Sequence, residues 1–425
     1  MDSWDDTSQP RRLYTAEWVL PIADEPIRGG WVSIENGRVE GVGSGAPGDA
    51  VDLGAAVLLP ALVNAHTHLE LSYLRGRVPP GTRFTDWIRA LMGLRRQYPD
   101  PAATEILSAA RVAIAEAHAS GTGLVGDISN TLVEVPLLRD ARMPAQVFYE
   151  LLGFSVQDPA GCVRAARERV DALLRAEPPP RDVRISLAPH APYSVSPALF
   201  TAIRDDLDAH KGDVSSVHLG ESPAEIAFLQ AGGGDLRAIL EEFGVWNEEW
   251  RPPAVSPVAY LSNLGFVDSR ALVVHGVQFD GDDLKLLGAM DTTLVSCPRS
   301  NQHVGAGVPP IEAFYAMDVK VAFGTDSLAS APDLNMFAEL AEARRLAPRV
   351  PARRLIESAT LVAARALGFG REFGSIEPGK RASLIAVRVP AHVTDVEDYL
   401  VSGVPPDAIS WVEDGQFRAT GSQRL

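Results

Sequence analysis

Residues 58–72 read LLPALVNAHTHLELS and join an apolar run to a polar strand end. The run at 61–66 has the length and apolar character of a buried strand. Because residues at i and i+2 of a strand point to the same face, His66 and His68 are predicted to offer two imidazoles to one point. A metal site is one interpretation. The other is a pair of polar residues at a strand–loop junction, and this short motif alone leaves both open.

Further apolar runs follow this one, and helical patterns with amphipathic spacing lie between most of them. The predicted strands after the first are 122–129, 145–152, 183–190, 214–219, 271–276, 292–297 and 319–326. Eight such β/α units predict an α/β fold of the (β/α)8 TIM-barrel type. A doubly wound open sheet is the alternative, and the lack of a G-x-G-x-x-G motif in the first unit weakens it.

Both flanks of this middle region are rich in short β runs and turns. Asn36-Gly37 marks a hairpin tip, and residues 373–390 repeat the pattern around Pro378-Gly379. We therefore expect one small β-sandwich domain built from both termini. The predicted domains are 1–59 and 367–425 for the small β domain and 60–366 for the catalytic barrel. Residues 231–258 look like a long insertion after the fifth barrel strand.

Composition excludes some classes of protein. The 425 residues are 46% hydrophobic with a net charge of −16, and no basic cluster is large enough to predict a nucleic-acid partner. The two cysteines fit a reducing compartment, and no signal peptide or membrane-length apolar run is visible. We expect a cytoplasmic protein with a small-molecule partner and no membrane partner. The oligomeric state is left open, a homodimer included.

Polar residues end five of the eight predicted strands. They are His66, His68, His190, His218, His275 and Asp326. Five of the nine histidines are among them, and the carboxyl ends of barrel strands are where catalytic groups lie. Each residue has a simpler interpretation: a lone buried histidine is more often hydrogen-bonded in a core, and Asp326 could pair with an arginine. Glu221, just after His218, is either a proton carrier or a solvated loop residue. The joint pattern favours an active site.

In this order the residues resemble the amidohydrolase superfamily, in its cytosine/adenosine-type deaminase and chlorohydrolase branch. The resemblance spans nearly the whole chain. The motifs that carry it are LLPALVNAHTHLELS (58–72), PHAPYSVSP (189–197), HLGES (218–222), CPRSNQHVGAGVPP (297–310), GTDSLAS (324–330) and SIEPGKRASLIAV (375–387).

The resemblance implies a site for one divalent metal ion, zinc first, with iron or manganese as alternatives. The positions that match its ligands are His66, His68, His218 and Asp326. Glu221 matches a proton shuttle, His275 matches a histidine beside the metal-bound water, and His190 matches a substrate contact. No lysine ends the fourth predicted strand, so a carbamylated bridge to a second metal is not expected.

The implied reaction is hydrolytic deamination of a cyclic amidine. Metal-bound hydroxide attacks the amino-bearing ring carbon, Asp326 and Glu221 accept its proton, and Glu221 protonates a ring nitrogen and then ammonia. HTHLELS followed by FTDWIRALM (84–92) looks most like the aminofutalosine deaminases of menaquinone biosynthesis, which predicts a 6-aminopurine-like nucleoside, aminodeoxyfutalosine first. Arg83 is the candidate for the tail carboxylate and Trp87 for the ring. The predicted substrate contacts are His190, Glu70, Ser72, Arg83 and Trp87.

Other functions compete with this one. Within enzymes they are deaminases of the adenosine, methylthioadenosine, guanine or cytosine type, and chlorohydrolases that act on a heteroaromatic ring. From a different class, the chain could be a metal-bound scaffold without catalysis. The joint presence of Glu221, His275 and Asp326 argues against a scaffold, because a scaffold needs no proton shuttle.

Overall fold

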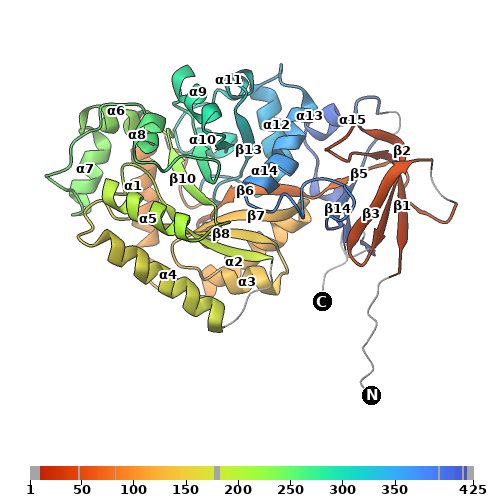
Figure 1. Cartoon of the computed structure of the whole chain (residues 1–425), viewed down its shortest axis with the longest axis horizontal. Helices are drawn as coiled ribbons and strands as arrows, with labels where there is room; N and C mark the ends of the chain where they lie inside the picture. The colour runs from red at the N-terminus through yellow and green to blue at the C-terminus, as the bar shows by residue number, and fades with distance from the viewer. Residues whose placement is uncertain are drawn as a thin grey trace.

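The structure is a computed structural model that describes residues 10–45, 48–81, 83–176, 182–390, 393–413 and 416–418. It contains a large α/β body and a smaller β domain beside it (Figure 1). No helix in the described segments is long and apolar enough to cross a membrane.

The large body is built around parallel strands in two four-stranded sheets, ordered β6-β7-β8-β9 and β10-β11-β12-β13. The strands are β6 (Leu62–Thr67), β7 (Thr122–Ser129), β8 (Ala145–Leu151), β9 (Val183–Pro189), β10 (Ser215–Leu219), β11 (Ala271–His275), β12 (Thr293–Ser296) and β13 (Lys320–Phe323). Backbone hydrogen bonds join the two sheets at both seams: His218 N donates to His190 O at 2.9 Å, and Asp326 N donates to His66 O at 3.0 Å. The predicted barrel class is confirmed, and each observed strand overlaps a predicted one.

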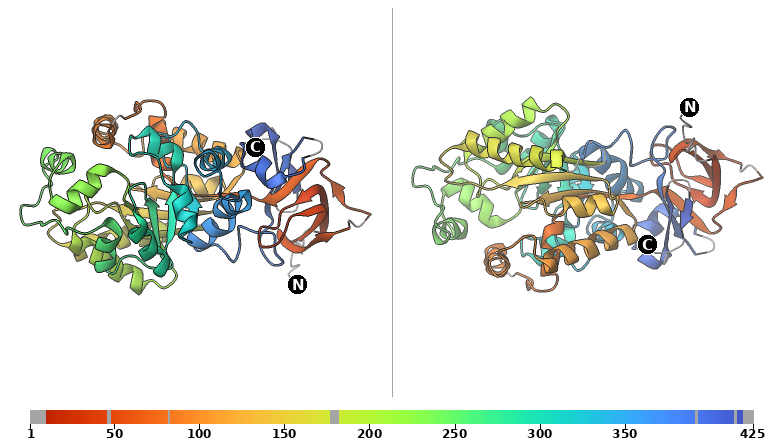
Figure 2. Two further views of the ribbon diagram at one scale, coloured as in Figure 1. Left: turned by 90° about the horizontal axis from the view of Figure 1, so that it is seen from above. Right: turned by 90° about the horizontal axis from the view of Figure 1, so that it is seen from below.

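The barrel strands are buried on both faces, which explains their uninterrupted apolar sequences. All eight residues of β7 and all seven of β8 are buried. Parallel strands covered by helices on the outside and by side chains on the inside lose the alternation of a half-exposed strand. The two further views in Figure 2 show helices surrounding this strand layer.

Helices follow most barrel strands, and several begin at a Ser-Pro pair. Ser196, Ser222 and Ser256 each cap a helix by accepting a hydrogen bond from a backbone N–H three residues on, and proline occupies the next position. The α-helices are α1 (Phe84–Arg95), α2 (Thr104–Ala119), α3 (Val135–Asp140), α4 (Pro159–Ala176), α5 (Pro197–Ala209), α6 (Pro223–Ala231), α7 (Asp235–Glu242), α8 (Pro257–Asn263), α9 (Gly281–Ala289), α10 (Pro298–His303), α11 (Ile311–Ala316), α12 (Met336–Leu346), α13 (Ala352–Glu357), α14 (Ala363–Ala366) and α15 (Val396–Leu400). Short 3-10 or π turns are η1 (Leu69–Leu74), η2 (Ser358–Val362) and η3 (Pro406–Ala408).

The small domain draws its strands from both ends of the chain. They are β1 (Arg12–Val19), β2 (Ile27–Glu35), β3 (Arg38–Ser44), β4 (Val51–Asp52), β5 (Ala56–Pro60), β14 (Ser383–Arg388), β15 (Ile409–Glu413) and β16 (Gln416–Arg418). β14 pairs antiparallel with β5, so that Ile385 lies opposite Leu59. The sequence predicted a sandwich, whereas these described strands are hydrogen-bonded into one mixed sheet. The domain boundaries themselves stay a prediction.

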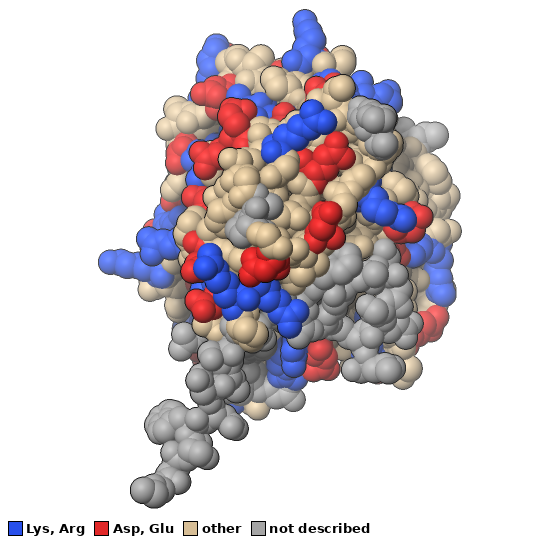
Figure 3. Space-filling model, turned by 90° about the vertical axis from the view of Figure 1, so that its right-hand side faces the viewer, with Lys and Arg blue, Asp and Glu red and all other residues tan. Residues whose placement is uncertain are grey.

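The outer face of the small domain carries both signs of charge. In the view of Figure 3, Lys and Arg side chains are interspersed with Asp and Glu side chains. No large patch of a single sign forms among the described residues drawn on that face.

The insertion predicted at 231–258 contains α7 and the chain that returns to α8. Its two tryptophans pack on aromatic side chains outside it: Trp250 stacks on Phe228 with ring centroids 4.6 Å apart, and Trp246 stacks on Phe154 at 5.7 Å. These aromatic contacts therefore hold the insertion against the barrel.

The seam between β6 and β13 depends on a residue without a side chain. A Cβ atom at Gly324 would lie 2.7 Å from both Cβ and the carbonyl oxygen of His66. Atoms at that distance overlap, so the two strands approach this closely only with glycine at this position.

We expect Gly324→Ala to lower the free energy of unfolding by about 1–3 kcal/mol, as overpacking does in a tight core. Denaturant unfolding measures this loss. Gly93→Ala is the control, because its Cβ would meet no atom within 4 Å and alanine favours the interior of α1. A Gly324→Ala protein as stable as wild type would contradict the tight seam.

Candidate active site at the carboxyl ends of the barrel strands

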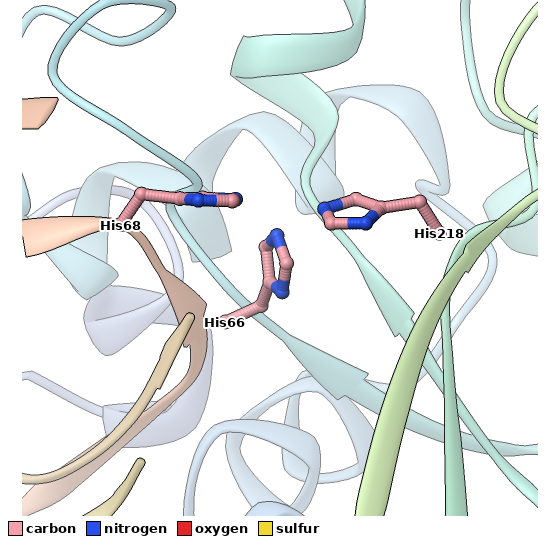
Figure 4. A group of neighbouring side chains, drawn as sticks. All are labelled: His66, His68 and His218. Atoms are coloured by element: carbon pink, nitrogen blue, oxygen red, sulfur yellow. The ribbon is translucent and has the colours of Figure 1, made fainter. Parts of the chain in front are cut away.

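Three histidines from opposite sides of the barrel converge at its carboxyl end. His66 lies in β6, His68 lies just after it, and His218 lies in β10. Figure 4 shows the three rings directed toward a common centre. One ring nitrogen from each comes within 4.8 Å of the others. Strand periodicity brings His66 and His68 together, and barrel closure adds His218.

Asp326 completes this group from the end of β13. Its Oδ1 lies 3.5 Å from His68 Nε2 and 3.9 Å from His66 Nε2. The Ser300 hydroxyl donates to the other oxygen, Oδ2, at 2.6 Å, and Oδ1, which accepts from Ser327 N at 2.7 Å, faces the histidines. Asp326 has a φ of +58°, a left-handed conformation that is uncommon outside glycine and recurs at functional sites.

These donors fit a divalent cation. Both ring nitrogens of His66 are buried, and neither has a hydrogen-bond partner among the described residues. Buried polar atoms are almost always paired, so an unpaired imidazole beside a carboxylate indicates a ligand. Burial lowers the pKa of His66 well below its usual value and that of His68 to about 3. Both rings are therefore neutral, the form that binds metals.

Glu221 and His275 face each other next to this group. His275 Nε2 lies 3.6 Å from Glu221 Oε1, and both side chains are buried. Burial raises the pKa of Glu221 well above that of a free carboxyl group, and the carboxylates of Asp326 and Glu225 raise it further. A carboxyl group with a raised pKa can hold and release a proton near neutral pH.

The orientation of His275 is set by Asn301 on α10. Asn301 Nδ2 lies 2.9 Å from His275 Nδ1, and an amide nitrogen can only donate. The ring must then accept at Nδ1 and carry its proton on Nε2, toward Glu221. His275 also has a left-handed backbone, with φ of +81°.

Glu225 fixes the backbone on which Glu221 sits. Its two carboxylate oxygens accept hydrogen bonds from Gly220 N at 2.9 Å and Glu221 N at 3.0 Å. Sequence reasoning missed Glu225, Ser300 and Asn301. The four-residue spacing of the two glutamates in HLGESPAE was a usable signal, whereas nothing local in CPRSN shows which groups its side chains reach.

His218 is held from behind by two groups. Its Nδ1 lies 3.0 Å from the His190 carbonyl oxygen and 3.4 Å from Glu150 Oε1. The His190 ring lies beside it, with centroids 4.9 Å apart, and its own Nδ1 lies 2.6 Å from Ser194 Oγ. Glu150, at the end of β8, was also missed by the sequence reasoning, because a glutamate within an apolar strand carries no motif.

The remaining predicted contacts lie on η1 and α1. Glu70 is buried and accepts hydrogen bonds from the Ser129 hydroxyl and from both N–H and O–H of Thr131. Ser72 is buried as well, and its hydroxyl has no partner among the described residues. Trp87 packs into the apolar core. The exposed Arg83 guanidinium hydrogen-bonds to Asp86 and Asp235, at 3.0 Å each.

Comparison with known proteins identifies the family of the chain and several of its relatives. Residues 57–406 match the model of the amidohydrolase family. The aminodeoxyfutalosine deaminase of Deinococcus radiodurans is 31% identical over 76% of both chains. A 5-methylthioadenosine/S-adenosylhomocysteine deaminase of Moorella thermoacetica is 29% identical over 87% of this chain and 83% of its own.

A solved structure extends the comparison to three dimensions. The zinc-bound adenosine deaminase of Xanthomonas campestris superposes with a TM-score of 0.80 at 26% identity, covering 96% of this chain and 92% of that one. The family predicted from the motifs is confirmed. The chain is a hydrolase that belongs to the amidohydrolase family, in the branch that holds the deaminases.

Proposed function

We propose that the protein is a zinc-dependent deaminase of a 6-aminopurine nucleoside, with aminodeoxyfutalosine as substrate and a place in menaquinone biosynthesis. The observation that carries this proposal is the juxtaposition of two groups. An unpaired, buried His66 lies among His68, His218 and Asp326, and a Glu221–His275 pair lies beside them. The three histidines and Asp326 suit a metal ion, and the Glu221–His275 pair suits proton transfer next to that ion.

Each residue has a distinct part in this proposal. His66, His68, His218 and Asp326 would hold the ion, and four ligands of imidazole and carboxylate type suit zinc, with iron or manganese as alternatives. A divalent cation held there supplies Lewis acidity, which lowers the pKa of water to about 7.

The protein's own groups then handle the protons. Glu221 would carry a proton on its carboxyl group, deliver it to a ring nitrogen of the substrate, and later pass one to the departing ammonia. His275, with its proton on Nε2, would donate a hydrogen bond to the water oxygen that attacks the ring carbon and stabilise the charge that develops on it. The His190 ring lies next to His218, where it can contact a bound base.

Two kinds of relative support the substrate class, and they differ in the substrate itself. The Deinococcus protein acts on aminodeoxyfutalosine, and the Moorella protein acts on methylthioadenosine and S-adenosylhomocysteine, as their names state. All three molecules carry an adenine whose 6-amino group hydrolysis would release. The proposed chemistry is therefore common to both groups, and the tail of the nucleoside distinguishes them.

We expect elemental analysis of the purified protein to find about one equivalent of divalent metal per chain. His66→Ala should lose most of it, because the variant removes a buried ligand. His210→Ala, at the end of α5 and outside the cluster, should retain it. Two equivalents in the wild-type protein would contradict a mononuclear site.

We expect Glu221→Gln to keep the metal and lose roughly 10²- to 10⁴-fold in kcat, the usual worth of a general acid–base group. The exposed Glu249→Gln is the control and should keep full activity. Metal content measured in parallel separates a lost proton carrier from a lost ligand. If Glu221→Gln turns over normally, the proton shuttle belongs to another residue.

We expect ammonia release from aminodeoxyfutalosine to exceed that from adenosine, methylthioadenosine, guanine and cytosine in kcat/KM. A coupled ammonia assay measures all five, and halide release from a chlorinated triazine tests the chlorohydrolase alternative. Preference for guanine or cytosine, or release of halide without ammonia, would show that the substrate assignment is wrong.

A further inference from the structure

A cavity of about 510 Å³ lies next to the histidine cluster, between η1, α1 and the loop after β7. Its wall is connected to the cluster by a short chain of contacts. Asn130, in the wall, donates from Nδ2 to Glu150 Oε2 at 2.8 Å, and Glu150 Oε1 lies 3.4 Å from His218 Nδ1. Two side chains, Asn130 and Glu150, therefore separate the cavity from the Nδ1 side of the His218 ring.

Most of the wall is apolar or aromatic. The residues of this kind are Leu71, Tyr73, Met92, Tyr98, Pro99, Pro101, Ile106 and Leu152. Leu152, just past β8, is 52% exposed, although the strand before it is fully buried. An exposed leucine on the wall of a cavity beside an active site is where the apolar part of a ligand gains most from contact.

The cavity wall contains more positive than negative side chains: Arg95 and Arg96 against Glu70. Arg95 lies 3.3 Å from Asn130 Oδ1 and 3.5 Å from Glu70 Oε1, so these two charges compensate each other. Arg96 lies over the ring of Phe243, 4.9 Å from its centroid. Among the described residues, no carboxylate lies within ion-pair distance of Arg96. The exposed Arg96 therefore carries a positive charge at the edge of the cavity that no carboxylate of the described residues neutralises.

We propose that this cavity binds the tail of the nucleoside substrate, and that it selects an apolar tail ending in a carboxylate, which Arg96 binds. The proposal rests on the proposed deaminase function and deepens it. A planar guanidinium matches a carboxylate, and its stacking on Phe243 holds it in place for that contact. Arg83 is less suited to this part, because Asp86 and Asp235 already neutralise its charge.

The charge pattern separates the substrates that the comparisons leave open. Aminodeoxyfutalosine has a carboxylate on its tail and no ammonium group. The methylthio tail of methylthioadenosine is uncharged and gains nothing from Arg96. The tail of S-adenosylhomocysteine carries an ammonium group beside its carboxylate, and a wall with a spare positive charge disfavours that group.

The test measures kcat/KM for aminodeoxyfutalosine and methylthioadenosine on the metal-loaded full chain, in wild type, Arg96→Met, Arg96→Lys and a control. The control is Arg111→Met, an exposed arginine of α2 that is not part of the cavity wall. In Arg96→Met we expect the ratio of the two kcat/KM values to fall roughly 10-fold or more, the worth of one charge-assisted hydrogen bond. The loss should be in KM, because the contact is remote from the reacting carbon.

The conservative variant Arg96→Lys checks that the positive charge is responsible for the preference between the two substrates. Arg96→Lys keeps the positive charge and should recover part of the ratio, and Arg111→Met should leave it unchanged. An Arg96→Met enzyme with an unchanged ratio would overturn the tail site while leaving the deaminase function intact. A wild-type enzyme that releases no ammonia from any adenine nucleoside would overturn both.

Discussion

The closure of the barrel between β6 and β13 is the constraint on which the site depends. Asp326 N donates to His66 O across this seam, and Gly324 lets the two strands approach within contact of the His66 backbone. The same seam brings the Asp326 carboxylate up to the two histidines of the first strand. A shift of one strand would separate His66 from Asp326, two proposed ligands that are 260 residues apart in sequence, so we expect fold stability and metal binding to be coupled here.

Around this seam, a layer of buried hydrogen bonds sets the orientation of the groups that face the centre. Ser300 holds one oxygen of Asp326, Asn301 determines which nitrogen of His275 carries the proton, and Glu225 fixes the backbone at Glu221. None of these three residues is part of the proposed ligand set. Their hydrogen bonds fix the orientation of each reactive side chain. Groups that are oriented in advance stabilise a developing charge with little rearrangement.

The proposed chemistry and the proposed specificity belong to different parts of the molecule. The reacting groups lie on strand ends of the rigid barrel, whereas the cavity with Arg96 is walled by η1, α1 and a loop. Deaminases of this family can then share one reaction and differ in the tail that they accept, because strand-end loops vary without disturbing the barrel. Phe243, which supports Arg96, directly follows α7 of the insertion.

The sequence alone determined the barrel class, because apolar runs at regular intervals leave few other architectures, and the histidines and aspartate at the ends of these runs indicated a site. His66 and His68 follow from strand periodicity alone. Only the tertiary structure assigned contacts to Ser300, Asn301, Glu150 and Arg96. Their partners lie on other helices and strands, so no local sequence pattern predicts these contacts. The pairing of Arg83 with Asp235 is of the same kind: the sequence offers a free arginine, and the folding of the insertion against α1 neutralises it.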